Sequence, residues 1–426
     1  MRVQKEVIVI VGGYSTGQYL APNFVARGYQ CVHVQPGANL IPYFLSSYRA
    51  DCFIKNIIWD DNDDEVLKEL LKFKVKIIIP GCEAAVLLAD RLSDRMGLFT
   101  TNEPSLSAAR RDKYLMQEAL KKAGLAHIKH YKSNDLGSIM QWIEESKLAY
   151  PVVIKPVASG GTDGVSICHN AQEVKKAFAN VYGTQNYLGL TNTEVLAQEF
   201  LYGSEYVVNT VSYDGQHFVT DVLKVHKRLI DNSPAYDYAE LLSPVDNQDV
   251  YARLTAYIRP ALDALGIKFG PAHSEIMMGD HTGPTLIETA ARVIGGIDPS
   301  AYTEALGYNQ ISVTVEAYVN PNGFSKILIT EGMQLVKYLI CVFLISPFKG
   351  MIENTPDVRE ILDLKFFHSL TLQDSGELKK TSNLIDCPGF VNLLSKNKQD
   401  LRQDYTHCRN IEKNMFAKMI GRIDHD

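Results

Sequence analysis

A lysine and a glycine-rich loop follow an apolar run near the middle of the chain. The stretch "VVIKPVASGGTDGV" at 152–165 places Lys155 at the end of that run, and the glycines come directly after it. Glycines let backbone N–H groups approach an anion closely, and a lysine held at a strand end is a fixed charge for a phosphate oxygen. The pattern predicts a phosphate site, although it lacks the Gly-Lys-Ser/Thr of a Walker A motif, and a flexible hairpin is the alternative. The loop residues concerned are Ser159, Gly160, Gly161, Thr162 and Gly164.

Two glutamates flank a predicted hairpin turn in "HSEIMMGDHTGPTLIE" at 273–288. Glu275 and Glu288 lie almost symmetrically about the turn, so antiparallel pairing places them on facing strands, roughly 4.5–5.5 Å apart at Cβ. Two like charges repel at that distance, but a bridging cation turns the repulsion into binding. Carboxylate oxygens suit Mg²⁺, which takes one or two of them together with substrate phosphates. We therefore predict a metal site, with two unrelated glutamates on an edge hairpin as the alternative.

An arginine and a histidine accompany this pair. Arg292 follows Glu288 by four residues, where a guanidinium could clamp a carboxylate or a phosphoryl group through two parallel hydrogen bonds. It could equally serve only to neutralise the two glutamates. His273 precedes Glu275 by two residues, and strand alternation therefore predicts that both side chains lie on one face. A contact with substrate and a purely structural histidine both remain open.

Two further stretches could meet a nucleotide or a substrate. In "QEFLYGSE" at 198–205, strand-end backbone could read an adenine edge and Glu205 could accept from ribose hydroxyls, although a plain edge strand has the same pattern. "VGGYSTG" at 11–17 lies between a strand and a helix but lacks the G-x-G-x-x-G spacing. The next strand ends at Gln35 rather than at the acidic residue that a ribose requires. This stretch predicts a tight turn that could face a substrate, not a dinucleotide site.

Composition limits the class of protein. The 426 residues carry a net charge of −6, which argues against a nucleic-acid binder. The seven cysteines are scattered without a C-x-x-C pair, so we expect reduced thiols in a cytoplasmic protein. The longest apolar run, at 338–345, is less than half a membrane span and predicts a buried strand instead.

The elements that must position these residues change in type along the chain. Strand-like runs such as 6–11 alternate with helical segments up to about residue 105, which predicts a parallel sheet with crossover helices. Helical spacing recurs at 110–124, and strands and helices alternate through 125–180. From 195 onward, strand-like runs separated by short turns, including Asp214-Gly215, predict an antiparallel meander.

Three later segments complete the pattern. Residues 227–244 carry turn residues and little periodicity, and we expect a loop there, either a lid or a plain connection. Residues 245–266 are expected to be helical, and 325–420 to mix short strands with a final helix. The acidic side chains Asp231, Asp237 and Glu240 could receive a basic substrate or face water.

Taken in order, five motifs resemble the ATP-grasp superfamily: "RRDKYLMQEAL", "VVIKPVASGGTDGV", "AQEFLYGSEYVV", "HSEIMM" and "LIETAARVIGG". Their order and spacing are specific, and the resemblance covers nearly the whole chain. It implies a multidomain α/β and α+β fold. The expected domains are an N-terminal parallel α/β domain at 1–105, a subdomain with the phosphate loop at 106–194, a central antiparallel subdomain with the metal site at 195–320, and a C-terminal β-rich domain at 321–426.

The resemblance also implies roles for individual residues. Lys113 and Lys155 would contact the phosphates of ATP, and the 159–164 loop would close over them. Glu275 and Glu288 would hold Mg²⁺, for which Mn²⁺ could substitute, and Arg292 would stabilise the transferring phosphoryl group and the substrate carboxylate. The residues implied to meet the adenosine are Gln198, Glu199, Phe200, Leu201 and Glu205, the last at the ribose.

Within the superfamily, "IETAAR", "YSTG" and "GGTDGV" are similar to the L-amino-acid ligases that make dipeptides. The implied reaction activates one amino acid as an acyl phosphate, which the amine of a second amino acid attacks, releasing ADP and phosphate. The implied partners are small amino-acid substrates and a second copy of the chain in a homodimer, with no nucleic acid and no membrane. A ligase for another carboxylate or amine, a carboxylase subunit and a non-catalytic nucleotide-binding protein are the alternatives. One departure stands out, because many superfamily members carry asparagine at the position of Ala290, and a second metal ion would need another ligand.

Overall fold

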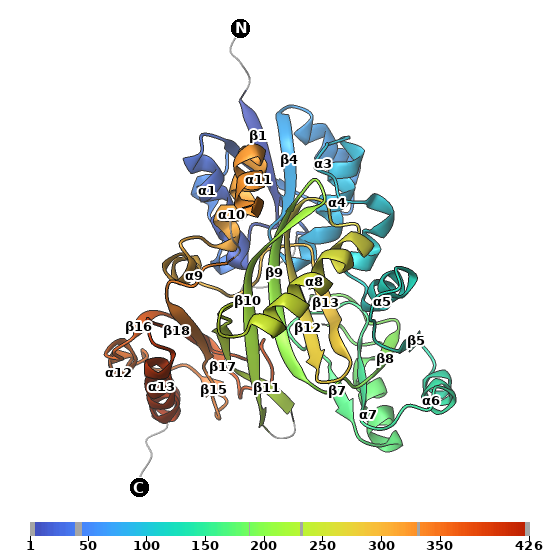
Figure 1. The fold of residues 1–426 in the computed structure, drawn as a ribbon, viewed down its shortest axis with the longest axis vertical. Helices are drawn as coiled ribbons and strands as arrows, with labels where there is room; N and C mark the ends of the chain where they lie inside the picture. Colours follow the sequence, from blue (N-terminus) through green and yellow to red (C-terminus); the bar gives the residue numbers. More distant parts are fainter. Residues whose placement is uncertain (1–4, 39–44, 187, 231–232, 330–332, 422–426) are drawn as a thin grey trace.

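The computed structural model describes residues 5–38, 45–186, 188–230, 233–329 and 333–421. The N-terminal sheet lies at the top of Figure 1, a small sheet lies at the lower right, and the C-terminal helix α13 lies at the lower left. A long central sheet connects these parts. In the described part of the chain, no helix is both long and apolar enough to cross a membrane.

The N-terminal part contains a four-stranded parallel sheet in the order β3-β2-β1-β4, as predicted. The β1 residues Val7–Val11 are almost completely buried, because helices cover both faces of the sheet. Its elements are β1 (Glu6–Val11), α1 (Leu20–Ala26), β2 (Gln30–Gln35), β3 (Lys55–Ile58), α3 (Asp63–Leu70), β4 (Lys74–Pro80) and α4 (Val86–Arg95).

The second part holds the glycine-rich loop. Asp112 caps helix α5 by accepting from the backbone N–H groups of Tyr114 and Leu115, and this cap places Lys113 at the first helical position. A small antiparallel sheet in the order β5-β8-β6-β7 carries α6 and α7, whose apolar residues share one core with its strands. The elements are α5 (Lys113–Lys122), β5 (His130–Ser133), α6 (Leu136–Glu145), β6 (Val152–Pro156), β7 (Ser166–Cys168), α7 (Ala171–Val181) and β8 (Val195–Glu199).

An eight-stranded sheet in the order β13-β12-β9-β10-β11-β14-β18-β16 forms the centre. The β9–β10 turn has positive φ at both Asp214 and Gly215, which is the hairpin geometry that Asp-Gly favours. Strand β8 was expected in this meander, but it pairs with β5 and β6 instead. The elements here are β9 (Ser204–Tyr213), β10 (Gln216–Ile230), β11 (Ser233–Leu241), α8 (Gln248–Ala264), β12 (Gly270–Gly279) and β13 (Gly283–Ala290).

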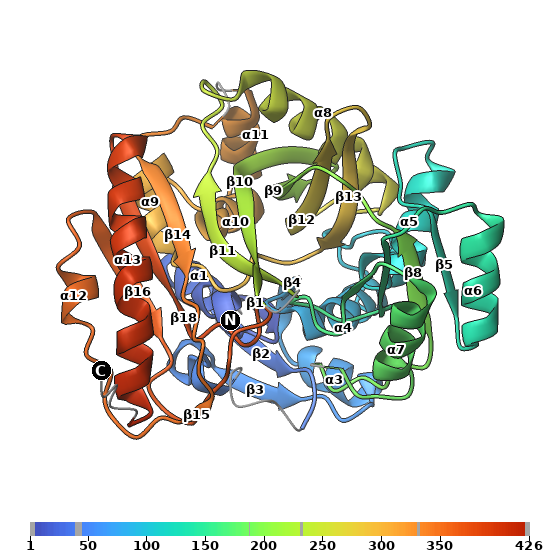
Figure 2. The same ribbon diagram turned by 90° about the horizontal axis from the view of Figure 1, so that it is seen from below.

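The C-terminal strands extend this same sheet. The expected strand at 338–345 is β14, which pairs with β11 and with β18. Helix α13 lies along the outer edge of the molecule beside these strands (Figure 2). The elements are β14 (Tyr338–Phe343), β15 (Gly350–Met351), α12 (Arg359–Leu362), β16 (Phe367–Leu372), β17 (Glu377–Leu378), β18 (Gly389–Ser395) and α13 (Lys398–Met419).

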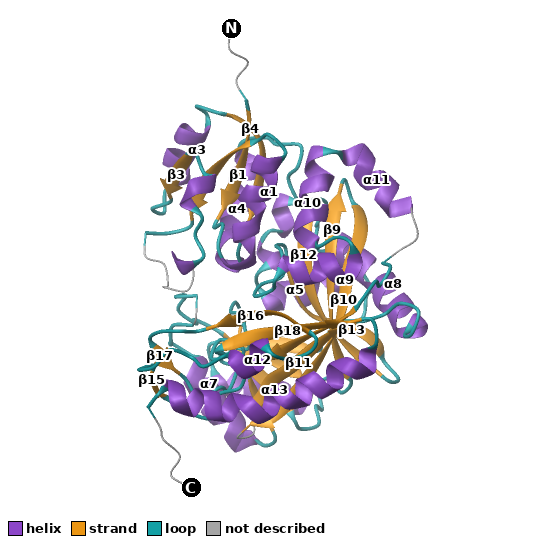
Figure 3. Ribbon diagram, turned by 90° about the vertical axis from the view of Figure 1, so that its left-hand side faces the viewer, coloured by secondary structure: helices purple, strands orange, loops and turns teal. Residues whose placement is uncertain are grey.

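Three helices lead from the central sheet to these strands: α9 (Pro299–Leu306), α10 (Gln310–Val319) and α11 (Pro321–Ile329). Helix α10 lies between the central sheet and the N-terminal sheet (Figure 3). Its residues Ile311, Val315 and Tyr318 share a buried cluster with Ile8 and Phe24. The N-terminal sheet therefore obtains part of its cover from a helix about 300 residues further along the chain.

The loop expected at 227–244, either as a lid or as a plain connection, is wrong. Strand β10 continues to Ile230 and β11 begins at Ser233, so most of the segment is a long hairpin whose second strand pairs with β14. The turn-forming composition of "DNSPAYD" concealed this pairing, because strand register depends on partners elsewhere in the sequence.

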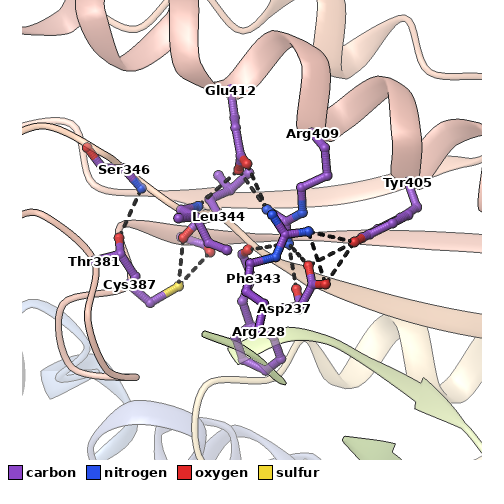
Figure 4. Close-up of polar contacts among 12 residues, drawn as sticks. Arg228, Asp237, Phe343, Leu344, Ser346, Thr381, Cys387, Tyr405, Arg409 and Glu412 are labelled. Carbon is purple, nitrogen blue, oxygen red and sulfur yellow. Dashed lines mark hydrogen bonds and ion pairs between the residues drawn. The ribbon is translucent and has the colours of Figure 1, made fainter. Parts of the chain in front are cut away.

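Two acidic side chains of this hairpin are bound to other side chains of the protein. The Asp237 carboxylate accepts hydrogen bonds from Tyr405 Oη at 2.9 Å and lies 2.8 Å from Arg409 Nη2 of α13 (Figure 4). Glu240 pairs with His226 at 3.1 Å and with Lys398 at 2.8 Å. Neither carboxylate is available to a basic substrate or directed to bulk water, and Asp231 lies outside the described residues.

Candidate active site

Two buried lysines lie at the junction of α5 and the glycine-rich loop. Lys155 is the penultimate residue of β6 and Lys113 begins α5, and both residues are buried. Lys113 Nζ donates to the Ser159 carbonyl at 2.8 Å, and the Lys113 backbone N–H donates to the Val157 carbonyl at 3.0 Å. The start of α5 therefore fixes the start of the loop.

The electrostatics of this site favour an anion. Burial, followed by the positive charge of Lys113, lowers the pKa of Lys155 to about 8, against the opposing effect of nearby glutamates including Glu288. Two ammonium groups in one partly dehydrated site repel each other. A polyphosphate would compensate both charges, so the chemistry of the site suits that ligand.

The glycine-rich loop contains a run of left-handed backbone. Gly161, Thr162 and Gly164 have φ values of +65°, +62° and +68°. The hydroxyl groups expected to face phosphate are engaged within the loop, since Ser159 Oγ donates to Asp163 at 2.9 Å and Thr162 Oγ1 donates to the Gly161 carbonyl at 2.6 Å. Phosphate contact through these hydroxyls requires them to exchange partners.

The C-terminal part of the chain reaches this loop. A Cβ atom added to Gly161 would lie 3.0 Å from Ile385 Cγ1, whereas one added to Gly160 would meet nothing within 4 Å. The neighbouring Leu384 packs against the apolar cluster that contains Tyr236 and Ile294. The 384–385 segment therefore contacts both the phosphate loop and the central sheet.

The facing glutamates lie where the sequence predicts. Glu275 of β12 and Glu288 of β13 are direct partners in the strand register. Lys113 Nζ lies 2.9 Å from Glu288 Oε2, and His273 Nε2 lies 3.7 Å from Glu275 Oε1. Burial raises the pKa of Glu275, but His273 and nearby lysines outweigh that effect and lower it to about 2.

The donor set at this position fits a hard cation. Two carboxylates on adjacent strands would supply the oxygen ligands that Mg²⁺ prefers, together with phosphate oxygens. Among the residues that the structure describes, however, no three His, Cys, Asp or Glu side chains are gathered around one point. The Lys113–Glu288 ion pair occupies part of this site, so cation binding must redirect Lys113.

Glu83, which the sequence did not predict as a site residue, binds the side chain of Arg292 and orients it. Arg292 Nε donates to Glu83 Oε2 at 2.7 Å and Arg292 Nη1 donates to the Val293 carbonyl at 2.9 Å. Arg111 donates to the other oxygen of Glu83. Burial opposes ionisation of Glu83, but the two guanidinium groups outweigh it and lower the pKa of Glu83 to about 2. Arg292 is therefore paired with Glu83 and not with the facing glutamates.

A signal for Glu83 was present in the sequence. The residue follows "KIIIPGC", a buried parallel strand and a glycine turn. Functional side chains in α/β sheets gather at the carboxyl ends of such strands. The identity of its two arginine partners depends on tertiary structure, and no local pattern gives it.

The predicted adenosine residues lie around the ends of β8 and β9. Gln198 is buried, and its amide nitrogen has no partner among the described atoms. Glu199 Oε1 accepts a hydrogen bond from the Lys129 backbone N–H at 2.8 Å, so this oxygen is already bound to the protein. Glu205 Oε2 lies 2.7 Å from Lys227 Nζ, while its buried Oε1 has no described partner. Phe200 and Leu201 follow β8 directly.

The turn at 11–17 faces the segment after Arg292. The backbone N–H of Gly296 donates to Ser15 Oγ at 3.4 Å, and that of Ile297 donates to Thr16 Oγ1 at 3.3 Å. The Gly13 N–H donates to His33 Nε2 at 3.1 Å. The turn is thus held against one border of the candidate site, and that it faces a substrate stays a prediction.

Comparisons with known proteins identify the family of the chain. Residues 148–300 match the ATP-grasp domain family. The chain is 35% identical to dapdiamide A synthase of Enterobacter agglomerans, over 99% of this chain and 98% of that protein. It is 24% identical to the alanine–anticapsin ligase of Bacillus subtilis strain 168, over 56% of this chain and 55% of that protein.

A solved structure has a similar fold over nearly the whole chain. The L-amino acid ligase of Bacillus licheniformis superimposes with a TM-score of 0.76 and 15% sequence identity, covering 96% of this chain and 98% of that one. The multidomain fold expected from the sequence is thereby confirmed. The chain belongs to the ATP-grasp family and is an ATP-dependent carbon–nitrogen ligase.

Proposed function

We propose that this ligase joins two L-amino acids, or close analogues of them, into a dipeptide through an aminoacyl phosphate. The observation that carries the proposal is that Lys113 connects Lys155 and the facing pair Glu275 and Glu288 to Glu83, the carboxylate that binds Arg292. The relatives support the amino-acid substrates, because one is named an alanine–anticapsin ligase and a structural neighbour is an L-amino acid ligase.

The first step transfers the γ-phosphoryl group of ATP to the carboxylate of the first amino acid. Lys113 and Lys155 hold the phosphates, and the backbone of the 159–164 loop closes over them. Glu275 and Glu288 would hold Mg²⁺, which would neutralise charge on the phosphate oxygens. Arg292, directed by Glu83, holds the carboxylate that receives the phosphoryl group and stabilises the charge that develops on it.

The second step forms the amide bond. The amine of the second amino acid attacks the acyl carbon, a tetrahedral intermediate collapses, and phosphate leaves. In this proposal Arg292 compensates the charge of the oxyanion and of the departing phosphate, and no covalent enzyme nucleophile is required. We assign adenine contacts to the Gln198–Leu201 segment and the ribose contact to Glu205, whose buried Oε1 lacks a described partner.

An acyl phosphate must be protected from water. The 227–244 segment is a hairpin in which residues 238–240 pair with both β10 and β14, and we do not assign the lid to it. We assign this role to the glycine-rich loop together with the 384–385 segment, which contact each other at Gly161 and Ile385.

Phosphate release from Mg·ATP tests the proposal directly. The purified protein is assayed with the twenty L-amino acids, singly and in pairs, and the products are weighed by mass spectrometry. Release that depends on particular pairs, with a product mass equal to both amino acids minus water, supports dipeptide ligation. Release that requires a different carboxylate or amine would replace it with another carboxylate–amine ligase activity.

A further inference from the structure

Residues 381–387, here called the arm, form a loop that is held in shape by its own hydrogen bonds. Asn383 Oδ1 accepts from the backbone N–H groups of Ile385 at 2.8 Å and of Asp386 at 3.0 Å. Asparagine side chains that bind backbone two and three residues further on fix a turn in this way. Ile385 lies against Gly161 of the glycine-rich loop. Its position therefore depends on where the two ends of the arm are attached.

Both ends of the arm are attached to the segment that follows β14. The Thr381 N–H donates to the Ser346 carbonyl at 2.8 Å, and the Ser346 N–H donates to Thr381 Oγ1 at 2.9 Å. At the other end, Cys387 Sγ donates to the Leu344 carbonyl at 3.4 Å. Figure 4 shows both attachments below helix α13. The arm is therefore placed by residues 344–346.

Helix α13 holds this segment through two charged side chains. Arg409 Nη2 donates to the Phe343 carbonyl at 2.8 Å, and Glu412 Oε2 accepts from the Ile345 N–H at 2.9 Å. Arg409 Nη1 lies 2.7 Å from the same Glu412 oxygen, and Arg409 Nη2 lies 2.8 Å from Asp237 Oδ1. One guanidinium group therefore connects α13, the β10–β11 hairpin and the end of β14 (Figure 4).

This ion pair network is nearly dehydrated. The side chains of Arg409, Asp237 and Glu412 are 9%, 11% and 7% exposed. Buried ion pairs often stabilise a fold no more than apolar residues of the same volume would. The planar guanidinium group does, however, hold its partners in a fixed geometry. The position that it imposes on the end of β14 is therefore the property that distinguishes Arg409 from an apolar residue.

We propose that Arg409 is a positioning residue of the ligase, which places Ile385 where the closed glycine-rich loop meets it. The inference rests on the proposed role of that loop in holding the phosphates of ATP. The arm is bonded at both ends, whereas Gly161 and Gly164 give the loop its conformational freedom. In this arrangement the loop closes onto a fixed arm, and a displaced arm lets the loop open and the nucleotide leave sooner.

The rate of nucleotide release tests this role. A fluorescent ADP analogue bound with Mg²⁺ is chased with excess ATP in a stopped-flow instrument. Arg409→Lys keeps the positive charge beside Asp237 and Glu412 but loses the planar fork, and Ile385→Ala shortens the contact with the loop. We expect each variant to release the analogue about 3-fold faster or more. An unchanged rate in either folded variant overturns the proposal.

A third variant breaks the connection between Arg409 and the arm. Thr381→Val removes the oxygen that accepts from the Ser346 N–H while keeping the shape of the side chain. It should accelerate release as Arg409→Lys does, and an unchanged rate overturns the proposal even if Arg409→Lys fails to fold.

The double variant of Arg409→Lys and Ile385→Ala separates positioning from stability. If Arg409 acts through Ile385, the double variant should release the analogue no faster than Ile385→Ala alone. A rate equal to the product of the two single effects would overturn the proposal. A merely structural role would lower the free energy of unfolding without changing release from the folded protein.

A matched control is available on the same helix. Lys398 lies 2.8 Å from Glu240, so this pair also joins α13 to the β10–β11 hairpin. Among the described residues, no hydrogen bond or ion pair joins Lys398 to residues 343–346. Lys398→Met should leave the release rate unchanged. An acceleration as large as that of Arg409→Lys would overturn the proposal.

This proposal and the proposed dipeptide reaction fail in different ways. Faster, non-additive release in the variants without product from any amino-acid pair keeps Arg409 as a positioning residue and removes the dipeptide reaction. Pair-dependent product formation with unchanged or additive release rates keeps the reaction and removes the role of Arg409.

Discussion

Arg292 Nε donates to Glu83 Oε2 at 2.7 Å across 209 residues of sequence. The bond joins the N-terminal sheet, which supplies Glu83 after β4, to the segment that follows β13. Arg111 donates to the same carboxylate from the turn before α5. One acidic side chain therefore links three parts of the chain and sets the direction of the proposed catalytic arginine.

Glu83→Gln should lower both stability and activity. The substitution removes the charge that compensates two guanidinium groups, and breaking a buried ion pair typically costs about 3–5 kcal/mol. The folded-state pKa of Glu83, about 2, lies below the usual glutamate value. Its stabilising effect is therefore present above roughly pH 4.5 and is lost as the pH falls towards 2. Urea unfolding from pH 7 down to pH 4 measures the free energy of unfolding of the wild type and of Glu83→Gln. The difference between these two free energies should narrow only at the acid end of this range. A difference that does not depend on pH would contradict the ion-pair explanation.

Nucleotide affinity should fall as the pH rises through about 8. Lys155 must carry its proton to bind phosphate, and its pKa is lowered to about 8 by burial and by Lys113. The unfolded chain keeps this proton up to a higher pH, so the buried charge lowers the folding stability below pH 8. This loss of stability disappears as the pH rises from roughly 8 to 10.4. Calorimetric titration with ATP at pH 7 and pH 9 measures the affinity. Lys155→Arg, which stays charged, is the control and should lose much of this pH dependence.

Glu288→Gln should abolish turnover and leave the fold intact. The change removes one of two proposed metal carboxylates and the ion pair with Lys113. A metal ion stabilises transition-state charge by several kcal/mol, so we expect a loss of at least about 100-fold in turnover. Phosphate release with a saturating amino-acid pair measures it, alongside circular dichroism to confirm folding. Turnover near the wild-type value would remove Glu288 from the metal site.

Gly161→Ala should impair the phosphate loop where Gly160→Ala does not. Gly161 has φ +65°, and an added Cβ would press on Ile385 at 3.0 Å. The left-handed conformation alone costs a non-glycine residue about 1–2 kcal/mol. Gly160 lacks that restriction and has open space around the same atom. We expect a weaker apparent affinity for ATP only in Gly161→Ala, and equal effects in the two variants would mean that the contact with Ile385 is immaterial.

The sequence predicted those parts of the site that depend on local geometry. The Glu275–Glu288 pairing followed from their symmetry about one turn, and Lys155 from the strand that ends in glycines. The bond between Glu83 and Arg292 could not be predicted in this way, because no local spacing connects them. The strand pattern likewise identified β8 but not the strands that pair with it. Alternation of apolar residues shows which face of a strand is buried, but it does not show which strands lie beside it.

The packing of α10 on the N-terminal sheet has a consequence for synthesis on the ribosome. Ile8 of that sheet and Phe24 of α1 share a core with Ile311 and Val315. At about 5–20 residues per second, the 200 or so residues between α4 and α10 take roughly 10–40 s to emerge. During that interval the nascent chain exposes an apolar face that α1 alone cannot cover. We expect a fragment that ends at residue 105 to bind a hydrophobic dye strongly, and the full chain to bind it weakly.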